Sequence, residues 1–108
     1  MPDWDDEDEF DSETGVATET QKKVEKPPLY KVLLHNDDFT SMEFVVFVLM
    51  SVFHKDEQVA QHIMMEVHHK GVGVAGVFTF EIAEAKINKV TALARANEFP
   101  LLCTMEQE

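Results

Sequence analysis

Three consecutive polar residues, Asn36, Asp37 and Asp38, form the first stretch of the sequence that could do chemistry. Their amide and carboxylate oxygens accept hydrogen bonds, and such short side chains favour turns because they bond to nearby backbone groups. A cationic group is the natural ligand of a corner of this kind. Thr40 and Glu43 follow with the spacing of a Thr-x-x-Glu capping box, which predicts a helix with Thr40 as its N-cap.

Apolar residues with helical spacing follow this polar corner. Met42 and Val45 are one turn apart in a first predicted helix, and Met64 and Val67 are one turn apart in a second, with His68 beside them. If the two helices pack together, these side chains share one apolar pocket. The alternative is that they belong to an ordinary core, which the pattern alone favours. The polar corner favours the pocket, because a plain core has no use for an amide, a carboxylate and a histidine at its edge.

Metal binding and catalysis fit the sequence less well. His62 lies six positions before His68, so the two histidines share no helix face, and Cys103 is the only cysteine. The run 36–38 lacks the alternating acidic residues and the glycine of a calcium-binding loop. Asp37 and His68 could pair, but no serine or cysteine nucleophile has a motif around it, and Cys103 is expected to be a buried, inert thiol. We therefore expect no metal, no cofactor and no catalytic residue.

The elements that must position these residues can be predicted in chain order. We expect strands over 30–36, 72–78 and 101–105, and helices over 41–53 and 56–69, the second ended by Gly71. A third helix should start after Thr79 and end at 97–100. Its inner face is predicted to consist of Ile82, Ala83, Ile87, Val90 and Ala94. The order βααβαβ predicts an α+β sandwich, in which three helices pack on a three-stranded, mostly antiparallel sheet.

The first quarter of the chain differs in composition from the rest. Residues 1–26 contain ten acidic and three basic residues, a net charge of −7, out of −12 for all 108 residues. Such a segment cannot bury enough apolar surface to offset its chain entropy. We expect a disordered acidic N-terminal extension over 1–26, a boundary at Pro27 and Pro28, and a single folded core over 27–108.

The bulk properties exclude several classes of protein. The acidic charge should repel nucleic acid and anionic membrane surfaces. The N-terminus has no basic segment followed by an apolar one, so we expect no signal peptide. The longest apolar run, residues 44–50, is too short to cross a bilayer. A cytoplasmic, monomeric protein is the expectation.

Four motifs resemble the ClpS adaptor family. They are Pro27–Thr40 followed by Met42–Val45, Val67-His68 before Gly71, Gly76-Val77-Phe78-Thr79, and Phe99–Thr104. Together they span roughly residues 27 to 106 in the order and spacing of the family. The family usually has polar residues where this chain has Phe47 and Met50, and that difference leaves open whether this outer helix face has a partner of its own.

The resemblance implies a fold similar to the C-terminal domain of the ribosomal stalk protein, and an adaptor rather than an enzyme. Such an adaptor binds proteins with a bulky apolar N-terminal residue (Leu, Phe, Tyr or Trp) and delivers them to the Clp AAA+ unfoldase for degradation. The implied roles are as follows: Asn36, Asp37 and His68 bind the free α-amino group, Thr40 contacts the next backbone unit, Met42, Val45, Met64, Val67 and Leu101 line the side-chain pocket, and Glu81 and Lys86 dock on the unfoldase's N-terminal domain.

Two other classes of function remain as alternatives from the residues alone. A generic protein-interaction domain, in which the polar corner only caps a helix, would have no affinity for free N-terminal peptides. A hydrolase or metal protein would show turnover or bound metal. Glu81 and Lys86 on their own are equally compatible with an ordinary solvated helix face.

Overall fold

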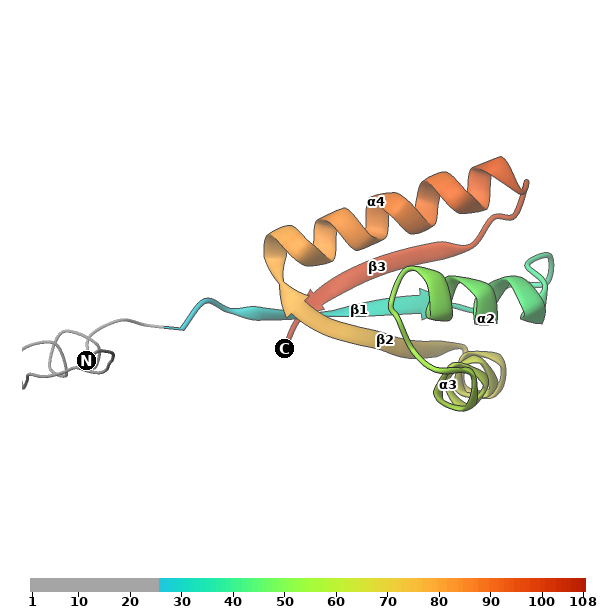
Figure 1. The fold of residues 1–108 in the computed structure, drawn as a ribbon, viewed down its shortest axis with the longest axis horizontal. Coiled ribbons are helices and arrows are strands. Elements are labelled where there is room, and N and C mark those ends of the chain that lie inside the picture. The colour runs from blue at the N-terminus through green and yellow to red at the C-terminus, as the bar shows by residue number, and fades with distance from the viewer. Residues whose placement is uncertain (1–25) are drawn as a thin grey trace, which may run out of the picture.

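The computed structural model describes residues 26–108 (Figure 1). The predicted extension over 1–26 therefore falls almost wholly outside the described residues. The elements follow in the order β1 (Leu29–His35), α2 (Met42–Ser51), α3 (Glu57–Lys70), β2 (Val72–Thr79), α4 (Phe80–Ala96) and β3 (Leu102–Gln107). The predicted order βααβαβ is confirmed, and the sheet is antiparallel throughout.

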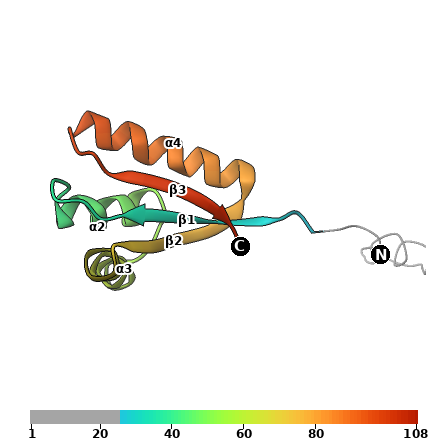
Figure 2. The ribbon, with the colours of Figure 1, turned by 180° about the vertical axis from the view of Figure 1, so that it is seen from behind.

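The central strand of the sheet is β1, which pairs with β2 on one side and with β3 on the other. Figure 2 shows this order from behind, with the start of β1 at the end of the sheet away from α2 and α3. The β1–β2 register shifts between Val32 and Leu33, where β2 contains one extra residue. Such a bulge lets both Gly73 and Gly76 face the core, opposite Leu34 and Val32, although they are three residues apart.

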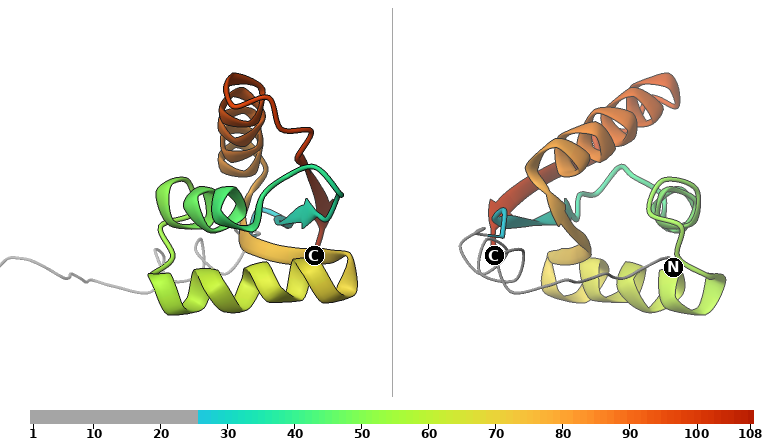
Figure 3. Two further views of the ribbon diagram at one scale, coloured as in Figure 1. Left: turned by 90° about the vertical axis from the view of Figure 1, so that its right-hand side faces the viewer. Right: turned by 60° about the vertical axis from the view of Figure 1, so that its left-hand side comes forward.

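One face of the sheet carries the hydrophobic core, as the alternation of buried residues along the strands requires. Val32 and Leu34 of β1 are fully buried, and Cys103 of β3 lies beside them. All three helices gather on this side of the sheet (Figure 3). Val74 and Leu102 point to the opposite face and are exposed. The fold is therefore two layers, with the helices over one face of the sheet.

Helix α3 begins and ends as the sequence predicts. The Asp56 side chain accepts a hydrogen bond from the Val59 backbone N–H at 2.9 Å, which makes Asp56 the N-cap. Gly71 ends the helix with φ +87°, in the left-handed region where glycine is favoured, and its N–H donates to the Val67 carbonyl. This sharp end directs the chain straight into β2.

Helix α4 differs from its predicted inner face at one residue. Ala83, Val90 and Ala94 are buried and Ile87 packs against the core, but Ile82 is 49 % exposed. The stripe 83, 87, 90, 94 follows the helical repeat, and Ile82 lies about 100° away from it. The prediction for Ile82 was therefore wrong. Thr79 stands at the N-cap position, as predicted, but its side chain makes no capping hydrogen bond.

Helix α2 is apolar almost all round, and part of that surface is exposed as the small size of the domain requires. Phe44, Val45, Val48 and Leu49 are buried, whereas Phe47 is 50 % exposed. The Phe47 ring lies 6.2 Å from that of Phe44, which in turn packs 4.8 Å from Phe99 at the end of α4. The outer face of α2 thus exposes Phe47 and, one turn further on, Met50.

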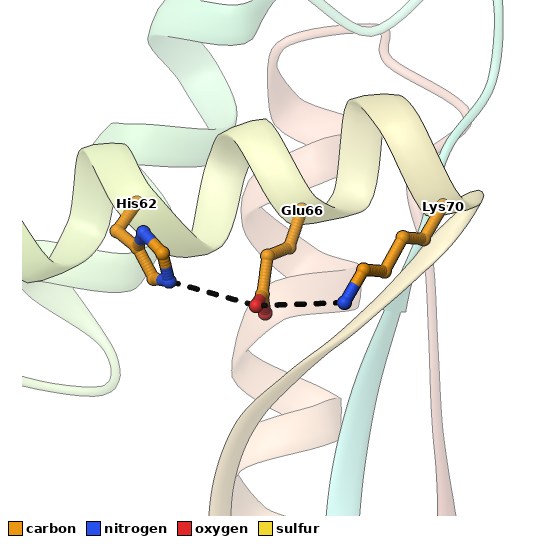
Figure 4. A network of polar contacts seen from close by, with 3 residues as sticks. All are labelled: His62, Glu66 and Lys70. Carbon is orange, nitrogen blue, oxygen red and sulfur yellow. Dashed lines mark ion pairs between the residues drawn. The ribbon is translucent and has the colours of Figure 1, made fainter.

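The outer face of α3 carries a row of polar side chains, although Val59 and Met65 are also exposed. Glu66 accepts contacts from His62 at 3.5 Å and from Lys70 at 3.9 Å, one helical turn away on either side (Figure 4). Such exposed pairs stabilise a helix by only about 0.3–0.5 kcal/mol each. His62 therefore belongs to a solvated helix face and not to a metal site. Across residues 26–108, no helix is both long and apolar enough to span a membrane.

Candidate functional site

The corner between β1 and α2 is organised by Asp37. One carboxylate oxygen accepts the backbone N–H groups of Phe39 and Thr40 at 2.8 and 2.7 Å, and the other accepts the Thr40 hydroxyl at 2.7 Å. A carboxylate has about four lone-pair sites, so about one acceptor site remains for a ligand. Asp37 thus holds the loop in shape and keeps its negative charge at the same place.

This arrangement corrects the predicted capping box. The N-cap of α2 is Ser41, whose Oγ accepts the Phe44 N–H at 3.1 Å, and the helix begins at Met42. The Thr40 hydroxyl does not cap the helix, because it turns toward the Asp37 carboxylate, to which it donates a charge-assisted hydrogen bond. The lone pairs of the Thr40 hydroxyl remain available as acceptors.

The pKa of Asp37 is set by two opposing effects. Burial raises it, but the hydrogen bonds from the Thr40 hydroxyl and from the Phe39 and Thr40 N–H groups lower the pKa below its ordinary value of 3.8. The carboxylate is therefore charged at neutral and mildly acidic pH. Its contribution to stability is present above pH 3.8 and is lost only as the pH falls through the still lower folded-state pKa.

Asn36 and His68 come to this corner from two elements that meet there: Asn36 follows the end of β1, and His68 lies in the last turn of α3. The Asn36 N–H donates to the Gly71 carbonyl at 2.9 Å, which ties the end of β1 to the end of α3. Both side chains are exposed. Within residues 26–108 the Asn36 amide makes no hydrogen bond, and the only contact recorded for the His68 ring is with His69, at 5.2 Å between centroids. Both side chains are free to bind a ligand.

These groups surround one cavity of about 260 Å³. It opens between the polar corner, the start of α2 and the second half of α3. Its lining consists of Asn36, Asp37, Asp38, Thr40, Met42, Val45, Met64, Val67 and His68. The volume lies below the roughly 300–1,000 Å³ of typical small-molecule sites, so it suits a single side chain.

The structure thus brings together eight of the nine residues that were predicted for the ligand pocket. Leu101 is the exception: it is only 7 % exposed, belongs to the core and does not line the cavity. Its contact with a ligand stays a prediction. Asp38 also lines the cavity, although it was not among the residues predicted to bind the amine. The presence of two adjacent carboxylates in one corner was the signal that could have identified it.

The two residues predicted for docking lie on a different surface. Glu81 and Lys86 line a cavity of about 300 Å³ between the end of α2 and the start of α4. The Lys86 ammonium donates to the Val52 carbonyl at 2.7 Å and lies within 6.0 Å of the Phe53 and Phe78 ring centroids. Lys86 therefore also joins α4 to the C-terminal end of α2, a role that the sequence did not reveal.

The Asp and His side chains at the cavity do not form a metal site. Residues 26–108 contain no cluster of three or more side chains that could hold a metal ion. Cys103 is buried, as predicted, and its burial raises the pKa of the thiol from 9.0 to about 12, so that it is a poor nucleophile at neutral pH. The site can hold a cation beside an apolar group, which describes binding and not turnover.

Comparison with known proteins gives a consistent result. A family model described as "ATP-dependent Clp protease adaptor protein ClpS" matches residues 25–104. The ClpS of Myxococcus xanthus is 56 % identical over 98 residues, covering 89 % of this chain and 92 % of that protein. The ClpS of Methylococcus capsulatus is 55 % identical over 102 residues, covering 94 % and 96 %.

A solved structure extends the likeness to the fold. Agrobacterium tumefaciens ClpS2 bound to L-phenylalaninamide superposes with a TM-score of 0.74 at 43 % identity, covering 77 % of this chain and all of that one. Fold and cavity define a small α+β binding module with an apolar pocket beside a polar corner. The chain belongs to the ClpS family of Clp protease adaptor proteins. Members of this family are adaptors without catalytic activity, which agrees with the predicted absence of an enzyme site.

Proposed function

We propose that this adaptor binds proteins through their N-terminal residue, with the free α-amino group at the polar corner and a bulky apolar side chain in the cavity. The observation that carries the proposal is the composition of the cavity wall. Met42, Val45, Met64 and Val67 supply its apolar part, and the acceptors come from the polar corner and from His68. The related ClpS2 has been solved with L-phenylalaninamide, which combines an α-amine with a phenyl side chain.

The amine, and not the apolar group, must provide the discrimination. An aromatic side chain buries roughly 150–250 Å², which corresponds to about 4–6 kcal/mol gross. Association costs an estimated 4–15 kcal/mol, so the apolar contact alone gives weak binding. An internal Phe in a loop would also fit. Selectivity for a chain terminus therefore comes from the charge and the three N–H donors of the ammonium.

Each polar group has a distinct role in this proposal. The Asn36 carbonyl oxygen and an unprotonated ring nitrogen of His68 accept two of the ammonium protons, and Asp37 supplies its charge and its remaining lone pair. Thr40, whose hydroxyl donates a hydrogen bond to Asp37, accepts one from the N–H of the second residue of the bound protein. Because Asp37 also shapes the loop, its removal would disturb every one of these contacts.

The bound protein is then delivered to the Clp AAA+ unfoldase, with Glu81 and Lys86 on the docking surface. This surface and the cavity that binds the N-terminal residue are lined by different residues. One adaptor can therefore hold substrate and unfoldase at once. A cytoplasmic location and a monomeric adaptor complete the proposal.

The test is fluorescence anisotropy with a labelled peptide that begins with Phe, beside the same peptide N-acetylated. Acetylation should weaken binding at least about tenfold for each lost contact worth ~1.4 kcal/mol. Asn36→Ala should weaken binding of the free peptide, whereas the matched variant Asn88→Ala, at an exposed position of α4, should bind normally. Equal affinity for the two peptides would exclude recognition of the amine and favour a generic interaction domain.

A further inference from the structure

A groove adjoins the cavity that is proposed to bind the N-terminal residue, and it shares part of the cavity wall. It has a volume of about 530 Å³ and runs between α2 and α3. Its lining consists of Ser41, Met42, Glu43, Val46, Gln61 and Met64. Met42 and Met64 line both spaces, so the two methionines form the partition between them. We call this second space the α2–α3 groove.

We propose that the α2–α3 groove receives the side chain of the third residue of the bound protein, and that it selects Lys or Arg there. This inference rests on the proposed function, because the chain must first be anchored by its N-terminal residue. Thr40, the proposed contact of the next backbone unit, is followed directly by Ser41 in the groove wall. A chain that leaves the cavity past Thr40 therefore reaches the groove.

The register follows from the geometry of an extended chain. Successive side chains point to opposite sides, so residues 1 and 3 face the protein while residue 2 faces solvent. Their Cα atoms are about 6.6 Å apart at 3.3 Å per residue. That separation lets one side chain lie on each side of the Met42–Met64 partition. Methionine suits such a partition because its flexible side chain adapts to both occupants.

The choice of a long basic side chain follows from the lining. Met42, Val46 and Met64 offer an apolar floor for a methylene stem, and Val46 is only half-buried by the rest of the protein. Glu43, the one charged residue that lines the groove, and Gln61 are both exposed and offer acceptor oxygens there. Lys and Arg pack their stems on apolar surface while the charged end stays in water.

The experiment compares peptides that differ only at one position. Phe-Ala-Lys, Phe-Ala-norleucine and Phe-Ala-Glu peptides isolate charge from stem length, and a Phe-Lys-Ala peptide moves the charge to position 2. At low salt the Lys peptide should bind about two- to fivefold more tightly than the norleucine peptide, as expected for an exposed ion pair. The Glu peptide should bind most weakly. High salt should reduce these differences.

Two variants test the groove from opposite walls. Glu43→Gln should remove most of the difference between the Lys and norleucine peptides, and Gln61→Glu should enlarge it. Asn88→Asp adds the same charge on α4, outside the groove, and serves as the matched control that should leave the difference unchanged. The effect of Gln61→Glu is a gain, so it cannot come from a variant that simply fails to fold.

The outcomes separate this inference from the proposed function. If free and acetylated Phe peptides differ but Lys and norleucine bind equally at position 3, only the groove is overturned. A charge effect that is as large at position 2 as at position 3 would overturn the register. If the Phe peptides bind no better free than acetylated, the groove falls together with the proposed function.

Discussion

Residues of the polar corner both shape the loop and are proposed to bind the ligand, and the structure shows which residue does which. Asp37 uses three hydrogen bonds to shape the loop and keeps its charge for a ligand. Its neighbour Asn36 uses only its backbone N–H for the fold. The fold should therefore tolerate Asn36→Ala better than Asp37→Ala. A sequence pattern indicates that both are polar corner residues but does not reveal this division.

Met42 is the residue that we expect to control which N-terminal side chains enter the cavity. It is 43 % exposed at the first position of α2 and lines both the cavity and the adjoining groove. A β-branched residue such as Ile or Val has a stiff, broad stem close to the backbone, where it meets Met42 first. Met42→Ala should therefore admit peptides that begin with Ile or Val. Anisotropy titrations of Ile-, Val- and Phe-peptides measure this, and unchanged selectivity would place the gate elsewhere.

Cys103 gives a prediction for alkaline pH. Its folded-state pKa of about 12 exceeds the ordinary 9.0, so the unfolded chain loses this proton first. The stability contribution is complete well below pH 9 and declines as the pH rises towards 12; a decrease of about 1.4 kcal/mol is expected one pH unit above 9. Urea unfolding at pH 7 and at about pH 10, for the unmodified chain and Cys103→Ala, isolates this slope from that of Lys and Tyr. Parallel slopes would contradict it.

At the level of elements, the contact between α3 and β2 positions one wall of the cavity. A Cβ placed on Gly73 would lie 2.7 Å from Cγ2 of Val67 and 3.5 Å from the Ile63 carbonyl oxygen. Val67 is buried and β-branched, so it cannot rotate away. Only glycine lets helix and strand approach this closely, and the close approach holds Val67 against the cavity.

Gly73→Ala should therefore move α3 away from the sheet. Overpacking of this kind typically costs about 1–3 kcal/mol, and peptide affinity should fall because Val67 moves with its helix. Thermal unfolding and anisotropy measure the two effects. The double variant Gly73→Ala with Val67→Ala provides the control, because removing the obstructing methyl groups should recover part of the stability. Simple additivity of the two changes would mean that no clash exists.

The elements were easier to predict from the sequence than their junctions. All six were correct in type and order, with ends within one or two residues, because apolar periodicity and residues such as Asp56 and Gly71 are strong local signals. The predicted N-cap of α2 was wrong by one residue because the Thr40 hydroxyl turns toward Asp37, and the loop geometry that decides this is not a local sequence signal. The exposure of Ile82 and the burial of Leu101 depend on packing between distant segments, which periodicity does not contain.

On the scale of the whole molecule, the polar corner lies far from the point where the N-terminal extension joins the folded core. The polar corner follows the C-terminal end of β1, and the N-terminal extension joins the chain before its first residue, Leu29. Seven residues of strand separate the two, about 20 Å at 3.3 Å per residue. Figure 1 shows the start of β1 at the opposite end of the sheet from α3, whose last turns line the cavity. The extension is therefore attached far from the peptide site.

This separation leads to a prediction about residues 1–24, which carry most of the acidic charge of the extension. Their deletion should leave the affinity for a Phe peptide unchanged, because residues between 36 and 68 supply both the polar corner and the apolar wall of the cavity. Degradation of a reporter with N-terminal Phe by the purified unfoldase–protease pair should fall, since we expect the extension to serve delivery. A Gly/Ser segment of equal length is the matched control: if it restores degradation, length alone matters, and if it does not, the acidic composition is needed. Weaker peptide binding after deletion would contradict this division, because it would mean that the extension reaches the cavity despite its attachment at the far end of β1.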